Sequence, residues 1–124
     1  MIVKEGRTPR MLPFDMSGVE RGADGVLRYS NLPESLIESF RLSVDRVPDK
    51  ECLVEVGGER VSYRDAWDRS ARVAGGLRAM GIAKGDRVAI HLGNGNDWAY
   101  AFWGVQMAGG IAVPVNTRFT ESEV

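Results

Sequence analysis

Three adjacent residues near the end of the chain, Asn116, Thr117 and Arg118, combine an amide, a hydroxyl and a guanidinium group. They follow the apolar run Ile111–Val115, which is typical of a buried strand. Open α/β sheets bind ligands beyond the carboxyl ends of their strands. A guanidinium group also suits phosphate, because its planar fork forms paired, charge-assisted hydrogen bonds. The segment is therefore a candidate ligand-binding loop, and a solvated surface arginine is the alternative for Arg118.

A second candidate is the loop Gly93-Asn94-Gly95-Asn96-Asp97, which joins a predicted strand to a helix start. Backbone N–H groups and the helix dipole favour anions at such a place. A dinucleotide-binding loop, however, needs a third glycine where Trp98 stands and an acid about 20 residues later, where the uncharged Asn116 lies. Asp97 would also repel an anion. We therefore favour a turn with capping residues, and the chain has no Gly-x-x-x-x-Gly-Lys-Ser/Thr loop either.

The chain has one histidine and one cysteine, His91 and Cys52. Both lie in apolar strand patterns, so we expect His91 to be a hydrogen-bonded packing residue and Cys52 a packed thiol. Neither a metal-ligating set nor a Gly-x-Ser-x-Gly hydrolase motif is present. A single cysteine excludes an intramolecular disulfide and favours a reducing compartment.

Composition restricts the partners. The 124 residues are 44% hydrophobic and 27% charged, which is typical of a soluble globular domain. The net charge of −1 gives no basic excess that would favour nucleic acid or anionic lipid. We find no apolar run long enough for a transmembrane segment and no signal-peptide centre, and we therefore expect a cytoplasmic protein.

The elements that position these residues follow from periodicity and from helix and turn signals. A helix is predicted within 31–47, with Pro33 in its first turn and Pro48 after its end. Strands at 52–56 and 59–63 flank Gly57-Gly58 and predict a hairpin. Ser62, with Asp65 three residues on, caps a second helix that ends at Gly81. Its expected buried stripe consists of Ala66, Val73, Ala74, Leu77 and Met80.

The second half of the chain predicts a parallel βαβ unit. It consists of a strand at 87–92, a helix at 97–107 and a strand at 111–115, joined by short links. The aromatic residues of this helix are expected in the core rather than in a ligand wall: Trp98, Tyr100, Phe102 and Trp103. Residues 1–30 lack a sustained period and are predicted to form an arm. Thr120-Glu121-Ser122-Glu123 is a capping box for a further helix, so we expect the chain to be truncated.

Several short motifs occur together in an order that resembles the AMP-forming acyl-CoA synthetases of the adenylate-forming ligase superfamily. The resemblance is strong from Val61 to Glu123 and looser over 31–47. Thr117 stands where the family frequently has proline. The matching segments are Val61-Ser62-Tyr63, the alanine-rich stretch Ala66–Leu77, Gly81, Gly85-Asp86 with Val88, Asn94, Trp98, Ala108-Gly109 and Val113-Pro114-Val115-Asn116-Thr117-Arg118.

The resemblance implies an α/β fold in which 31–124 form a truncated N-terminal part of the AMP-binding domain, after an arm at 1–30. It implies a parent enzyme that uses ATP, Mg²⁺ and CoA to convert a carboxylate into an acyl-adenylate and then into a thioester. Asn116, Thr117 and Arg118 would border the CoA site, with Arg118 near a CoA phosphate. The family's phosphate loop and catalytic lysine would lie in the remainder of the parent chain, so no catalytic residue is assigned here and the fragment is expected to be inactive alone.

Three alternatives stay open at this point. Adenylation domains that load carrier proteins share the same opening motifs, although the Asn-Thr-Arg sequence favours CoA ligases. A nucleotide-dependent oxidoreductase would use the βαβ unit, and Trp98 and the missing acid count against it. A non-catalytic interaction module is disfavoured by the unfinished helix after Thr120.

Overall fold

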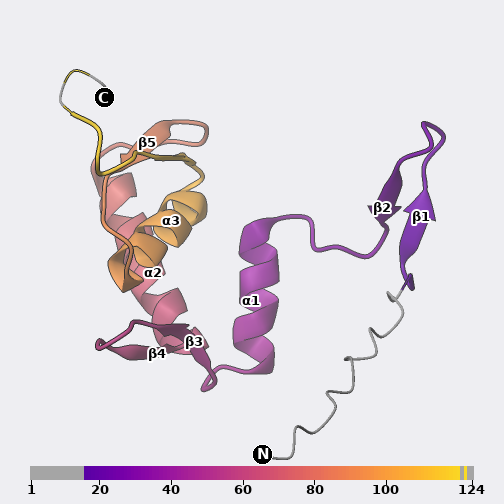
Figure 1. Ribbon diagram of the computed structural model, residues 1–124, viewed down its shortest axis with the longest axis horizontal. Coiled ribbons are helices and arrows are strands. Elements are labelled where there is room, and N and C mark those ends of the chain that lie inside the picture. The colour runs from indigo at the N-terminus through magenta and orange to yellow at the C-terminus, as the bar shows by residue number, and fades with distance from the viewer. Residues whose placement is uncertain (1–15, 121, 123–124) are drawn as a thin grey trace, which may run out of the picture. The chain divides into compact units, whose positions relative to one another are not determined.

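The computed structural model describes residues 16–120 and 122, which fall into two compact units divided between Leu32 and Pro33 (Figure 1). The helix predicted from Thr120 onward falls largely on residues outside the described range.

The smaller unit contains a hairpin that the sequence analysis did not predict. Strands β1 (Val19–Arg21) and β2 (Leu27–Tyr29) pair antiparallel. The turn between them uses Gly25 at φ +80°, a conformation that glycine adopts without strain. Asp24 Oδ2 and Arg28 Nη2 form an ion pair of 2.7 Å. The hydrogen bond from Arg28 lowers the pKa of Asp24 from 3.8 to about 2.

Helix α1 (Leu36–Arg46) begins where a side chain caps its backbone. The Oγ of Ser35 accepts a hydrogen bond from the N–H of Glu38, so Pro33 lies before the cap rather than in the first turn. The helix ends as predicted, before Pro48. Its buried residue is Phe40, which is 5% exposed.

The predicted hairpin and second helix are confirmed. Strands β3 (Glu51–Val54) and β4 (Arg60–Ser62) pair antiparallel, and α2 (Tyr63–Ala79) follows directly. The Ser62 Oγ accepts from the N–H of Asp65, and Gly81 follows the helix end at φ +95°. The expectation that Met80 is buried is wrong, because it caps the helix end and is 81% exposed.

The parallel βαβ unit is also confirmed. It consists of β5 (Arg87–Ile90), α3 (Asn96–Ala108) and β6 (Ile111–Pro114), with Arg87 opposite Ile111 and Ile90 opposite Pro114. Both strands thus end at the same edge, and the two loops that follow them lie at that edge (Figure 1).

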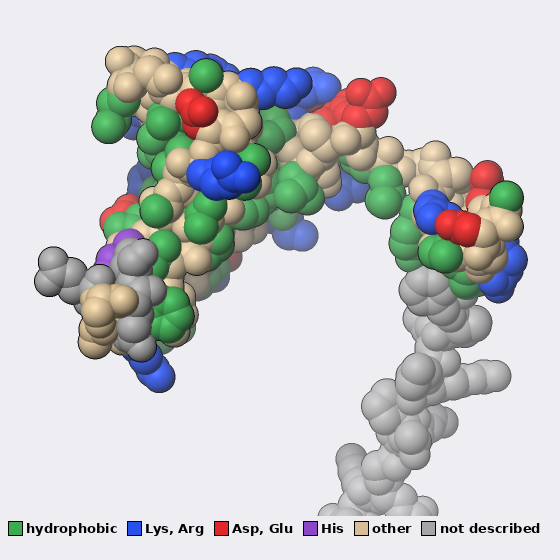
Figure 2. Space-filling view, turned by 90° about the horizontal axis from the view of Figure 1, so that it is seen from above, with side chains coloured by type: hydrophobic (Ala, Val, Ile, Leu, Met, Phe, Trp, Pro, Cys, Tyr) green, Lys and Arg blue, Asp and Glu red, His purple; other side chains and the backbone are tan. Residues whose placement is uncertain are grey.

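The core of the larger unit lies between α1, β4, α2 and α3. Its buried members are Phe40, Val61, Ala66 and Tyr100. The rings of Phe40 and Trp103 stack with centroids 4.5 Å apart. Other hydrophobic side chains stay open to solvent, as the space-filling view shows (Figure 2). Ile111 and Val113 on β6 are 48% and 37% exposed, although parallel sheets are normally covered on both faces.

Candidate functional site

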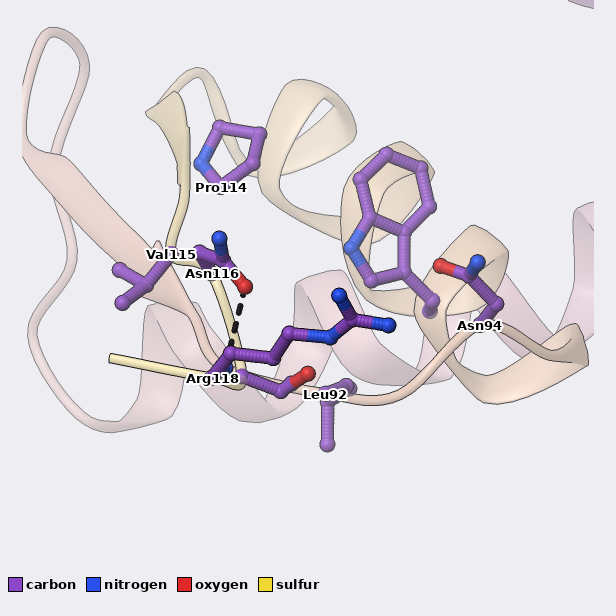
Figure 3. Close-up of a pocket in the computed structure, with 8 residues that line it drawn as sticks. Leu92, Asn94, Pro114, Val115, Asn116 and Arg118 are labelled. Carbon is purple, nitrogen blue, oxygen red and sulfur yellow. Dashed lines mark hydrogen bonds between the residues drawn. The ribbon is translucent and has the colours of Figure 1, made fainter. Parts of the chain in front are cut away.

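An open pocket of about 640 Å³ lies at the carboxyl end of the β5–β6 sheet (Figure 3). The position agrees with the rule that open α/β sheets bind ligands beyond the ends of their strands. The pocket brings together Asn116, Thr117 and Arg118, the three residues that the sequence analysis proposed as a ligand-binding loop. The lining residues are Leu92, Asn94, Trp98, Pro114, Val115, Asn116, Thr117 and Arg118.

One wall of the pocket is the loop after β6. The N–H of Val115 donates to the carbonyl of Ile90 at 2.9 Å, which ties the start of the loop to β5. Asn116 then shapes a turn, because its Oδ1 accepts from the N–H of Arg118 at 3.0 Å and its carbonyl accepts from Phe119 at 3.0 Å. Thr117 is exposed at the tip of this turn.

Arg118 presents its side chain to the pocket. In Figure 3 its guanidinium group extends across the pocket toward the side where Asn94 lies. The residue is exposed, so the group meets solvent as well as the pocket. A guanidinium group held at the end of a turn in this way can form paired hydrogen bonds with a phosphate or carboxylate ligand.

The facing wall comes from the β5–α3 loop and the first turn of α3. Leu92 and Asn94 belong to the loop, and Trp98 belongs to the helix. The Trp98 ring stacks on Phe102 with centroids 5.4 Å apart and an interplanar angle of 8°. The expectation that the four aromatic residues are core therefore holds for Tyr100 and Trp103 but not for Trp98, which lines the pocket. Phe102 is half-buried, with its ring against those of Trp98 and Trp103.

The β5–α3 loop itself is a capped turn, as favoured from the sequence. Gly95 occupies the N-cap position and offers no side chain, while Asn96 is 91% buried and donates to the carbonyl of Glu59 at 3.2 Å. A side pocket of about 280 Å³ beside the loop is lined by the acids Glu55, Glu59 and Asp97. Glu59 is ion-paired with Arg69, which lines the same pocket, so Glu55 and Asp97 are the carboxylates that oppose an anion at the helix start.

The side pocket beside this loop also contains a network formed by Arg69, Glu59 and Tyr100, which the sequence analysis did not predict. Arg69 on α2 donates to both carboxyl oxygens of Glu59, at 2.7 and 2.6 Å, and to the Tyr100 hydroxyl at 3.1 Å. The hydrogen bond from Arg69 lowers the pKa of Glu59, and burial raises the pKa of Tyr100. No local motif signals this network, since Arg69 lies 10 and 31 residues from its two partners.

The remaining candidates carry no site. Cys52 is half-buried against the core, which confirms a packed thiol, and burial raises the pKa of that thiol. The packing prediction for His91 is wrong: β5 ends at Ile90, so His91 falls in the following segment and is exposed. Within the described part of the chain, no three His, Cys, Asp or Glu residues are grouped to hold a metal, and no helix is long and apolar enough to cross a membrane.

Comparison with known proteins identifies the family to which the chain belongs. Residues 40–124 match the AMP-binding enzyme family. The chain belongs to this family. Two relatives of this chain are the acyl-CoA ligase sidI of Aspergillus fumigatus, 44% identical over 102 residues, and the long-chain-fatty-acid–CoA ligase of Bacillus subtilis, 34% identical over 94 residues. The matches cover 82% and 75% of this chain and 17% of each relative, so the chain spans about a sixth of their length.

Solved structures confirm the predicted fold class. A fatty acyl CoA synthetase of Mycobacterium tuberculosis matches 64% of this chain and 16% of its own, with a TM-score of 0.61 and 36% identity. The N-terminal domain of FACL13 from the same organism matches 68% of this chain and 21% of its own, with a TM-score of 0.65 and 35% identity. The NpsA N-terminal subdomain of Klebsiella oxytoca, with a TM-score of 0.69 and 23% identity, shares the fold. It covers 73% of this chain and 23% of its own.

Proposed function

We propose that this chain is the N-terminal part of an ATP-dependent acyl-CoA synthetase. Such an enzyme joins a carboxylate to AMP with release of pyrophosphate and then transfers the acyl group to the thiol of CoA. The observation that carries the proposal is the match of residues 40–124 to the AMP-binding enzyme family, together with relatives named as CoA ligases.

The pocket at the end of the β5–β6 sheet is our proposed CoA-side surface. Arg118 would bind a phosphate of CoA through its guanidinium group, while Asn116 holds the Arg118 backbone through the 3.0 Å bond of its Oδ1. Thr117 offers an exposed hydroxyl beside them. The pocket suits an extended polar ligand with an anionic group, because it is open and combines amide, hydroxyl, indole and guanidinium side chains.

The described residues do not fit ATP with Mg²⁺ in the same way. They hold no grouping of acids able to bind a metal ion, and the helix start nearest the pocket is flanked by Glu55, Glu59 and Asp97. We therefore assign ATP and Mg²⁺ to the remainder of the parent enzyme and derive no adenylation step from these residues. We also propose that the 124-residue chain alone does not turn over ATP, because its sequence contains neither the family's phosphate loop nor a lysine in a matching motif.

The test uses the intact synthetase that carries this chain, supplied with ATP, Mg²⁺ and a panel of carboxylates. We expect carboxylate-dependent exchange of pyrophosphate into ATP without CoA, and thioester formation when CoA is added. Absence of carboxylate-dependent exchange would overturn the proposal. Exchange followed by transfer to a phosphopantetheinyl carrier protein, with no transfer to CoA, would assign the chain to a carrier-loading adenylation domain instead.

A further inference from the structure

Three elements of the larger unit meet at Glu59, at the end of the β3–β4 turn. Its carboxylate accepts two hydrogen bonds from Arg69 of α2, and its carbonyl accepts one from the Asn96 side chain at the start of α3. Arg69 also contacts α3 directly, through the Tyr100 hydroxyl and with its guanidinium carbon 5.4 Å from the centre of the Tyr100 ring. The network thus fixes the N-terminal turn of α3 against α2 and the hairpin.

The same turn of α3 carries one wall of the pocket. The loop residues Leu92 and Asn94 line both the main pocket and the side pocket that Arg69 and Glu59 border. Asn96, which is 91% buried, follows Asn94 by two residues and precedes Trp98 by two. The position of Asn94 and Trp98 opposite Arg118 therefore depends on where the network holds Asn96.

Another ion pair in the same hairpin lacks this connection. Arg60 donates to both carboxyl oxygens of Glu51 at 2.5 and 2.6 Å, a geometry close to that of Arg69 with Glu59. Both Arg60 and Glu51 lie on the hairpin strands, and their side chains are 61% and 52% exposed, whereas the Arg69 side chain is 36% exposed. Among the ion pairs of the described residues, Arg69–Glu59 is the one whose arginine also contacts α3.

We propose that Arg69, acting through Glu59 and Asn96, is a positioning residue for the acceptor half-reaction, because it sets the Asn94–Trp98 wall that faces Arg118. Arg69 itself does not contact the acceptor. The inference rests on the proposed function, since it assumes that the pocket receives CoA. We therefore expect that loss of the hydrogen bonds among Arg69, Glu59 and Asn96 widens or shifts the main pocket, although none of these three residues lines it.

The experiment compares Arg69→Met with Arg60→Met in the intact synthetase. Both substitutions remove one charge and one two-pronged ion pair, but only the first disconnects α3. A second variant, Asn96→Asp, keeps the side-chain shape and replaces the N–H donor by an oxygen that faces the Glu59 carbonyl. This variant tests the same connection if Arg69→Met fails to fold, which thermal unfolding of each variant reports.

We expect Arg69→Met and Asn96→Asp to raise the KM for CoA about tenfold, since small misplacements of a binding group are costly. Pyrophosphate exchange without CoA should stay within about twofold of wild type, and Arg60→Met should change neither quantity. Equal loss of both half-reactions in Arg69→Met and Asn96→Asp would show a general structural role and overturn the inference. The inference would also be overturned if the KM for CoA in Arg69→Met and Asn96→Asp equalled that in Arg60→Met. A wild-type enzyme without carboxylate-dependent exchange would instead overturn the proposed function.

Discussion

The packing of α2 against α3 predicts opposite effects for two glycine-to-alanine substitutions. Gly104 of α3 is buried against Ser70 and Val73 of α2. A Cβ atom at this position would lie 2.6 Å from Cβ and Cγ1 of Val73 and 3.1 Å from the carbonyl oxygen of Ser70. Val73 is β-branched and on a helix, so its side chain has little freedom to move away.

The change in the free energy of unfolding expected for Gly104→Ala is the sum of two opposing contributions. Replacing glycine by alanine inside a helix stabilises it by about 0.5–1 kcal/mol, because alanine loses less backbone entropy on folding. Inserting a carbon into a packed interface costs about 1–3 kcal/mol. Because contacts of 2.6 Å force the helices apart, we place Gly104→Ala toward the upper part of that range, which leaves a net destabilisation of about 1–2 kcal/mol.

The matched control is Gly75→Ala on α2. Apart from its chain neighbours and the backbone of its own helix, no atom lies within 4 Å of a Cβ built there, so the substitution should stabilise the chain by about 0.5–1 kcal/mol. Urea unfolding of the 124-residue chain, followed by circular dichroism, measures both variants. If Gly104→Ala stabilises the chain as much as Gly75→Ala does, the close contact of α2 and α3 at Val73 is refuted.

Three further predictions concern a cap and two titrating groups. Ser62→Ala should destabilise the chain by about 1 kcal/mol in the same urea experiment, since it removes the N-cap of α2; no change would refute the cap. Asp24 should titrate with a pKa of about 2 by ¹³C NMR, and Arg28→Gln should return it toward 3.8. Because this pKa is lowered by folding, the ion pair stabilises the hairpin above pH 3.8 and is lost as the pH falls toward 2. Cys52 should react with iodoacetamide more slowly than an unstructured cysteine peptide at pH 8, because burial raises its pKa; equal rates would contradict its packing.

Local signals predicted most of the larger unit. Ser62 and Gly81 delimit α2, Gly57 marks the β3–β4 turn, and the apolar runs of β5 and β6 imply parallel pairing through α3. Such signals act between neighbouring residues, and the sequence displays them directly. The β1–β2 hairpin was not predicted because each strand has only three residues, too few to establish a period, although Asp24-Gly25 is a hairpin turn signal.

Contacts between residues far apart in the sequence were harder to predict. The loop of Asn116 and Arg118 was proposed as a ligand-binding loop because it follows a predicted strand, whereas the wall of the pocket that faces it was not predicted. Trp98 was assigned to the core because composition does not tell which side of α3 faces the pocket. The Arg69 network joins three elements, and His91 was misplaced because β5 ends one residue before it.

The most direct test of the account separates the two half-reactions in the Arg118→Ala variant of the intact synthetase. A charge-assisted contact with a CoA phosphate contributes about 1.5–3 kcal/mol, so the KM for CoA should rise about tenfold or more. Pyrophosphate exchange without CoA should be nearly unchanged. Arg87→Ala, which removes the same charge at the opposite end of the sheet, should affect neither. Unchanged CoA kinetics in Arg118→Ala, or equal loss of both half-reactions, would contradict a CoA-binding role for this pocket.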